Sequence, residues 1–168
     1  KPDNVFITST GVVKILDFGV AKLTAAASLA SDDPSQSNTE PGILLGTLGY
    51  LSPERIRDAP VDHRTDIFSL GVALYEMIAG ARPFDRTSAV STLSAILTED
   101  PPDLAHKRAG VPRAVARVIR DCLEKKPEDR FQSAADLALS LKALLDESAA
   151  FARPRVRDVR RAIGWWIS

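Results

Sequence analysis

The sequence predicts a mainly α-helical (α+β) domain that opens with a short β-hairpin and is built around one buried helix. Two apolar, β-branched runs lie close together near the start, at residues 5–7 and 12–16. Residues 64–80 place apolar side chains around a whole helical circumference, which is typical of a buried helix. The remaining chain reads as further helices joined by short links. A length of 168 residues with 45% hydrophobic content supports one domain with a sizeable core.

The hairpin predicts a site for a hard cation. Residues 8–11 supply turn residues, including a glycine, between the two runs. Because antiparallel strands bring the start of the first beside the end of the second, we expect Asn4 and Asp17 to face one site. Mg²⁺ takes one or two such oxygens and fills its shell with water and phosphate oxygens. Lys1 lies near enough to reach a phosphoryl group held on that metal.

The helical part has recognisable boundaries. Residues 64–80 are too short and too charged for a membrane span. Residues 89–97 predict a second helix, and Pro112 suits the first turn of a third that continues to about residue 123. Ser133 and Asp136 have the spacing of a capping box at the start of a long last helix. Residues 20–45, in contrast, have the composition of a mobile loop.

Charge and cysteine content exclude several classes of function. Lys+Arg and Asp+Glu number 22 each, so no whole-chain charge favours nucleic acid. Cys122 is the only cysteine, which excludes an intrachain disulfide and a cysteine metal cluster. Its apolar neighbours Val118, Ile119 and Leu123 indicate a buried thiol.

Two strings in the chain resemble a known family. Lys1-Pro-Asp-Asn4, followed after a hairpin by Asp17-Phe18-Gly19, resembles the catalytic loop and metal-binding triplet of eukaryotic-type protein kinases. Residues 46–54, Gly-Thr-Leu-Gly-Tyr-Leu-Ser-Pro-Glu, resemble the substrate-facing loop and the Ala-Pro-Glu end of the kinase activation segment, with Ser52 where alanine is usual. The order of these motifs is similar to the large lobe of a serine/threonine kinase of the bacterial eukaryotic-like kind.

The resemblance implies transfer of the γ-phosphoryl group of ATP to serine or threonine hydroxyls of a protein substrate. It implies Mg²⁺ (or Mn²⁺) held by Asn4 and Asp17, with Lys1 steadying the phosphoryl group. Thr47 is implied to position the substrate side of the site, and with Lys1 it favours serine/threonine over tyrosine specificity. The family's nucleotide-holding lobe and catalytic-base aspartate are expected upstream of Lys1. These 168 residues alone are therefore expected to be inactive.

The resemblance also implies structural roles. Gly19 completes the metal triplet, Glu54 pairs with Arg130 as a bidentate clamp, and Asp66 bonds the backbone of the catalytic loop. Residues 20–45 correspond to the activation loop, where a phosphate could order the segment. The phosphorylation candidates are Thr39, which is slightly favoured, Ser37 and Ser35. The alternative is that these three are ordinary loop hydroxyls.

Two other functions remain open. A pseudokinase or docking lobe would bind protein partners without catalysis, but such a lobe does not need metal ligands at Asn4 and Asp17. A metal-binding helical domain unrelated to kinases would need four residues to occur together by accident: Thr47, Glu54, Asp66 and Arg130.

The kinase resemblance covers residues 1 to about 146, and a shift in composition marks residues 149–168 as a basic tail. We therefore expect a kinase lobe at residues 1–148 followed by this tail. The tail carries five arginines against one acid, followed by Trp165 and Trp166. Arginines before paired tryptophans are typical of the cytoplasmic flank of a membrane helix. The pattern predicts a cytoplasmic catalytic domain that is anchored to the membrane by a helix beginning near Trp165. We expect the arginine-rich tail to bind an anionic membrane surface. The alternatives are a tail that folds back onto the lobe or is disordered.

Overall fold

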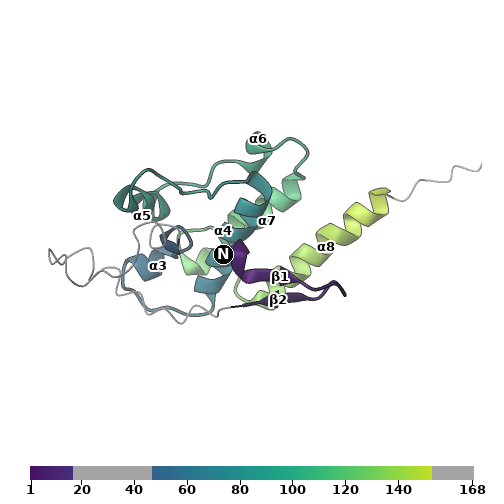
Figure 1. The fold of residues 1–168 in the computed structure, drawn as a ribbon, viewed down its shortest axis with the longest axis horizontal. Coiled ribbons are helices and arrows are strands. Elements are labelled where there is room, and N and C mark those ends of the chain that lie inside the picture. The colour runs from purple at the N-terminus through teal and green to yellow at the C-terminus, as the bar shows by residue number, and fades with distance from the viewer. Residues whose placement is uncertain (17–46, 153–168) are drawn as a thin grey trace, which may run out of the picture.

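The computed structural model describes residues 1–16 and 47–152, with side chains as far as residue 146. Within these residues a small two-stranded sheet lies beside a body of helices (Figure 1). In chain order the elements are η1 (Pro2–Asn4), β1 (Val5–Ile7), β2 (Val13–Ile15), α3 (Pro53–Ile56), α4 (Arg64–Ala79), α5 (Ala89–Thr98), α6 (Leu104–Lys107), α7 (Arg113–Cys122), η2 (Pro127–Asp129) and α8 (Ala134–Ala152).

The predicted N-terminal hairpin is confirmed. Strands β1 and β2 pair antiparallel, with Val5 opposite Ile15 and Ile7 opposite Val13. Gly11 makes the turn with φ of +79°, a left-handed conformation that a side chain would disfavour. Most apolar side chains of the hairpin are exposed within the described chain, Ile7 by 75%, whereas Val5 is half-buried.

Helix α4 is the scaffold of the described chain, and it lies at the centre of the helical body (Figure 1). It packs against η1, α6 and α7. Gly80 ends the helix in a left-handed conformation with φ of +75°, and its N–H donates to the Glu76 carbonyl at 2.8 Å. Only about half of its apolar side chains are buried, so the helix is less enclosed than the sequence predicts: Leu70 and Met77 are 42% and 49% exposed in the described chain.

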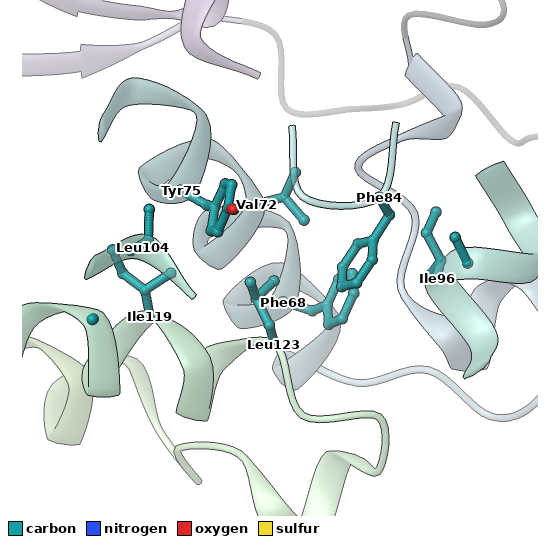
Figure 2. Packing of buried hydrophobic residues seen from close by; sticks show 10 residues of the cluster. Phe68, Val72, Tyr75, Phe84, Ile96, Leu104, Ile119 and Leu123 are labelled. Carbon is teal, nitrogen blue, oxygen red and sulfur yellow. The ribbon is translucent and has the colours of Figure 1, made fainter. Parts of the chain in front are cut away.

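The core forms where α4 meets the later helices (Figure 2). The Phe68 and Phe84 rings stack with centroids 6.2 Å apart and planes 9° from parallel. The other buried members of this cluster are Val72, Tyr75, Ala95, Ile96, Leu104, Ala116, Ile119 and Leu123.

A second cluster joins α4, α7 and α8 through Ile67, Val118, Cys122 and Leu137. Cys122 is fully buried, and burial raises the pKa of its thiol to about 12, which confirms the predicted buried thiol. Helices α4 and α7 approach closely at Gly71, where an added Cβ would lie 2.7 Å from the Cys122 Cβ.

The helix boundaries follow local capping signals. Ser88 and Ser91 form a reciprocal capping box at the start of α5. At the start of α8 the Ser133 hydroxyl accepts from the Asp136 N–H at 3.1 Å, as the sequence predicts. The short helices α3 and α6 were not predicted.

In the described residues no helix combines the length and the apolar character needed to cross a membrane. Helix α8 continues as far as Ala152. Trp165, Trp166 and the tail arginines lie outside the described residues, so the membrane-anchored tail stays a prediction.

Candidate functional site

The segment that contains Lys1 and Asn4 forms one tight turn on the surface of α4. The turn is η1, with Pro2 in its first position and a hydrogen bond from the Asn4 N–H to the Lys1 carbonyl at 3.0 Å. Proline suits this place because it supplies a helical φ and has no N–H that needs a partner. The Lys1 ammonium lies 3.7 Å from the Asp3 carboxylate, and both side chains are exposed. Lys1 is therefore accessible to a ligand in front of this turn.

Asn4 lies at the open end of the hairpin, where the two strands meet the helical body. The Leu16 N–H donates to the Asn4 carbonyl at 2.8 Å. This bond brings the residue before Asp17 directly beside Asn4. Asp17 itself lies outside the described residues, so the geometry of the pair stays a prediction. One amide and one carboxylate are a donor set that fits the few protein ligands Mg²⁺ accepts.

Residues 47–51, which we call the substrate-facing loop, form a compact turn anchored to α4. The Tyr50 N–H donates to the Thr47 carbonyl at 3.2 Å, and Leu48 is buried. The Ser69 hydroxyl donates to the Tyr50 carbonyl at 2.9 Å, and the Tyr50 phenol donates to the Glu76 carboxylate. Thr47 opens the loop and is exposed. Its role beside Lys1 stays a prediction.

Charged groups of α4 and of the η1 turn act on the half-buried Tyr50 phenol. Burial raises the pKa of the Tyr50 phenol, and so do its hydrogen bond to Glu76 and the charge of Glu76. The Asp3 carboxylate raises it further, because an anion nearby opposes formation of the phenolate. The two segments lie 47 residues apart in sequence, from Asp3 to Tyr50.

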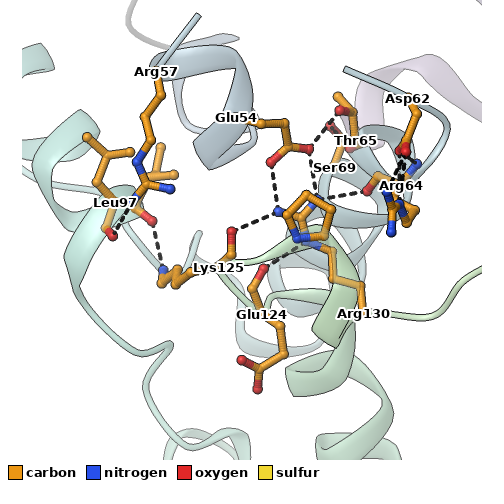
Figure 3. Close-up of polar contacts among 12 residues, drawn as sticks. Glu54, Arg57, Asp62, Arg64, Thr65, Ser69, Leu97, Glu124, Lys125 and Arg130 are labelled. Carbon is orange, nitrogen blue, oxygen red and sulfur yellow. Dashed lines mark hydrogen bonds and ion pairs between the residues drawn. The ribbon is translucent and has the colours of Figure 1, made fainter. Parts of the chain in front are cut away.

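A buried ion pair fixes the chain just after this loop (Figure 3). The Arg130 guanidinium donates to both oxygens of the Glu54 carboxylate at 2.8 Å, and the two side chains are 0% and 6% exposed. The Thr65 hydroxyl donates to the same carboxylate at 2.7 Å. The structure thus joins the two residues that the family resemblance paired.

Arg130 is held on all sides. Its guanidinium also donates to backbone carbonyls, and its Cζ lies 5.0 Å from the centre of the Phe68 ring. Those carbonyls belong to Arg64, Glu124 and Lys125. Burial of Glu54 opposes its ionisation, but the hydrogen bonds from Arg130 and Thr65 outweigh this effect and lower the pKa of Glu54 from 4.5 to about 2. The carboxylate is therefore structural and permanently charged near neutral pH.

The other predicted residues are not brought into this arrangement. Asp66 lies exposed in the first turn of α4, and its bond to the catalytic-loop backbone stays a prediction. The phosphorylation candidates and the end of the metal triplet lie outside the described residues. These are Ser35, Ser37, Thr39 and Gly19.

The sequence reasoning missed several residues that hold the substrate-facing loop. Tyr50 lies inside the most specific string, and Ser69 and Glu76 interrupt an otherwise apolar helix, so a signal was present for each. Arg82, which lies beside Gly49 and Tyr50, had no such signal.

The family described as "Protein kinase domain" matches residues 1–140. Serine/threonine-protein kinase PknL of Mycobacterium tuberculosis is 36% identical over 149 residues, covering 89% of this chain and 35% of that protein. Serine/threonine-protein kinase PknB of the same species is 38% identical over 141 residues, covering 84% of this chain and 21% of that protein.

A relative outside the mycobacteria is serine/threonine-protein kinase pkn3 of Myxococcus xanthus, 37% identical over 150 residues, with 86% of this chain and 26% of that protein covered. Among solved structures, the twitchin kinase region from C. elegans superposes with a TM-score of 0.61 at 24% identity, covering 84% of this chain and 23% of that one, which supports the fold. The chain spans about a third or less of the length of these curated relatives.

Proposed function

The chain belongs to the protein kinase family, and on that premise we propose that it forms the large lobe of an enzyme that phosphorylates serine and threonine hydroxyls of proteins. The donor is ATP with Mg²⁺ or Mn²⁺. The proposal is supported by one observation: the η1 turn and the substrate-facing loop both contact α4. The η1 turn with Lys1 and Asn4 packs on α4, and the substrate-facing loop is bonded to α4 through Ser69 and Glu76.

In this proposal each segment has a separate task. The Asn4 amide and the Asp17 carboxylate hold the cation, which supplies charge neutralisation for the phosphate groups when bound. The exposed Lys1 ammonium offsets negative charge that develops on the transferred group. Thr47 and the loop that follows it present the acceptor hydroxyl. The Glu54–Arg130 pair does no chemistry and keeps the end of this loop in place.

The function is tested in the protein encoded by the complete open reading frame that contains these residues. Transfer of labelled phosphate from Mg-ATP to a generic protein substrate is measured for the wild type and for Asp17→Ala. We expect Asp17→Ala to lower turnover on the order of 100-fold or more, because the lost group binds the metal. Its melting temperature should stay close to that of the wild type, since the carboxylate has no packing role in the proposal.

Asp146→Ala is the matched control, because it removes an exposed carboxylate from α8. It should leave both turnover and melting temperature unchanged. Retained activity in Asp17→Ala would disprove the assignment of Asp17. An inactive wild type that still binds a protein partner would instead favour the docking lobe.

A further inference from the structure

Arg82 lies immediately beyond α4 and is almost entirely covered. The Gly80 turn reverses the chain, and the Arg82 side chain is only 14% exposed. Its Nη2 donates to both oxygens of the Asp85 carboxylate at 3.0 Å. A long cationic side chain is usually exposed, so its burial here indicates a defined contact.

That contact is with the substrate-facing loop. The Arg82 Cζ lies 5.7 Å from the centre of the Tyr50 ring, within the range of a cation–π interaction. A Cβ built on Gly49 would lie 2.9 Å from the Arg82 Nη1 and 3.2 Å from its Cδ and Cζ. The guanidinium therefore lies directly against the loop backbone at Gly49.

An added side chain at Gly49 would conflict with the Arg82 side chain. The φ of Gly49 is outside the left-handed region, in contrast to Gly11, Gly80 and Gly110, so its backbone conformation suits any residue. A side chain at position 49 would have to displace Arg82, which Asp85 and the Tyr50 ring hold in place.

The loop is thus held from two sides. Ser69 and Glu76 on α4 bind the backbone and the phenol of Tyr50. Arg82 covers Gly49 and the same ring from the segment that follows α4. Both contacts act within residues 47–51, and neither involves Lys1 or Asn4.

We propose that Arg82 is a positioning residue that fixes the substrate-facing loop and thereby sets the affinity for the protein substrate. The inference rests on the proposed kinase function, with the protein substrate recognised along this loop. Arginine suits the role because its planar guanidinium stacks on Tyr50 and pairs with Asp85 at the same time, which a lysine ammonium does less well.

The experiment compares Arg82→Ala, Gly49→Ala and the double variant in the protein from the complete open reading frame. Apparent KM values are measured separately for a peptide substrate and for ATP. We expect each single variant to raise the peptide KM about fivefold, the effect of losing one partly buried cation–π contact. The KM for ATP and the melting temperature should change little.

The double variant separates this mechanism from general damage. If Gly49→Ala acts by displacing Arg82, each single variant removes the same contact between Arg82 and the loop. The double variant should then raise the peptide KM about fivefold, as either single variant does. Arg117→Ala is the control: it removes the same charge from the exposed surface of α7, where the side chain is 84% exposed. It should leave both KM values unchanged.

Hydrogen–deuterium exchange of the amides of residues 47–51 gives a readout that does not depend on activity. Exchange should accelerate in Arg82→Ala and stay at the wild-type rate in Arg117→Ala. Three results would overturn the inference. The peptide KM could stay unchanged in Arg82→Ala, the KM increases of the single variants could add up in the double variant, or the KM for ATP could rise as much as the peptide KM. An inactive wild type with accelerated exchange in Arg82→Ala would refute the kinase function and still support the role of Arg82 in holding the loop.

Discussion

Replacement of Glu54 by alanine tests the buried pair most directly. The change removes a carboxylate that accepts two N–H bonds from Arg130 and one O–H bond from Thr65. Arg130 keeps its three carbonyl acceptors but loses its counter-charge while it remains buried. We therefore expect Glu54→Ala to destabilise the protein strongly.

Two related arguments give the expected loss of stability. Removal of one partner from a buried ion pair costs about 3–5 kcal/mol, because the other charge is left uncompensated. The pKa of Glu54, lowered from 4.5 to about 2, corresponds to about 3 kcal/mol of stabilisation of the charged form. For a chain of this size, such a loss lowers the melting temperature on the order of 10 °C.

The assay is thermal unfolding followed by far-ultraviolet circular dichroism. Glu128→Ala is the control, since it removes an exposed carboxylate in η2 near Arg130 and should change stability by less than about 0.5 kcal/mol. A Glu54→Ala variant that melts with the wild type would refute the clamp.

The pH dependence gives a second check on the same variant. Because the pKa of Glu54 is lower in the folded state, its contribution is present above about pH 4.5 and is lost as pH falls through about 2. The difference between wild type and Glu54→Ala should therefore narrow between about pH 5 and pH 2. A difference that stays constant over this range would contradict the electrostatic origin of the effect.

Two further predictions concern the core. Gly71→Ala should destabilise the protein by about 1–3 kcal/mol, as measured by urea unfolding. The new Cβ would lie 2.7 Å from the Cys122 Cβ and 3.2 Å from the Leu123 Cδ2. A variant as stable as the wild type would show that α4 and α7 can move apart without cost. Tyr75→Phe should be neutral or slightly stabilising, because the buried Tyr75 hydroxyl has no hydrogen-bond partner among the described residues. A loss above about 1 kcal/mol would reveal a partner such as a bound water.

Local signals in the sequence were enough to predict most of the regular structure. The central helix was expected at residues 64–80 and ends at Ala79, because Gly80 adopts the left-handed conformation that ends helices. The helix expected at residues 89–97 runs one residue further. The short helix α3 could not be predicted in this way, since four residues carry no periodicity.

The candidate site depended more on distant contacts. Glu54 and Arg130 are 76 positions apart, so only the family resemblance could pair them. Charge and composition alone would have predicted that both residues lie on the surface. Arg82 gave no signal because its contact with Gly49 depends on how the chain turns after α4, which is a property of the tertiary fold.

The polar residues of α4 explain how one helix serves both the core and the site. Thr65, Ser69 and Glu76 follow one another at intervals of four and seven residues, so they lie within about 40° of one another around the helix. Each bonds the segment that runs from the substrate-facing loop into α3: Thr65 and Ser69 donate to it, and Glu76 accepts from it. The apolar residues on other faces of α4 pack into the core. Because the polar face is fixed relative to that packing, a shift in the core would move the loop with it. The stability of the core and the geometry of residues 47–51 are therefore coupled through α4.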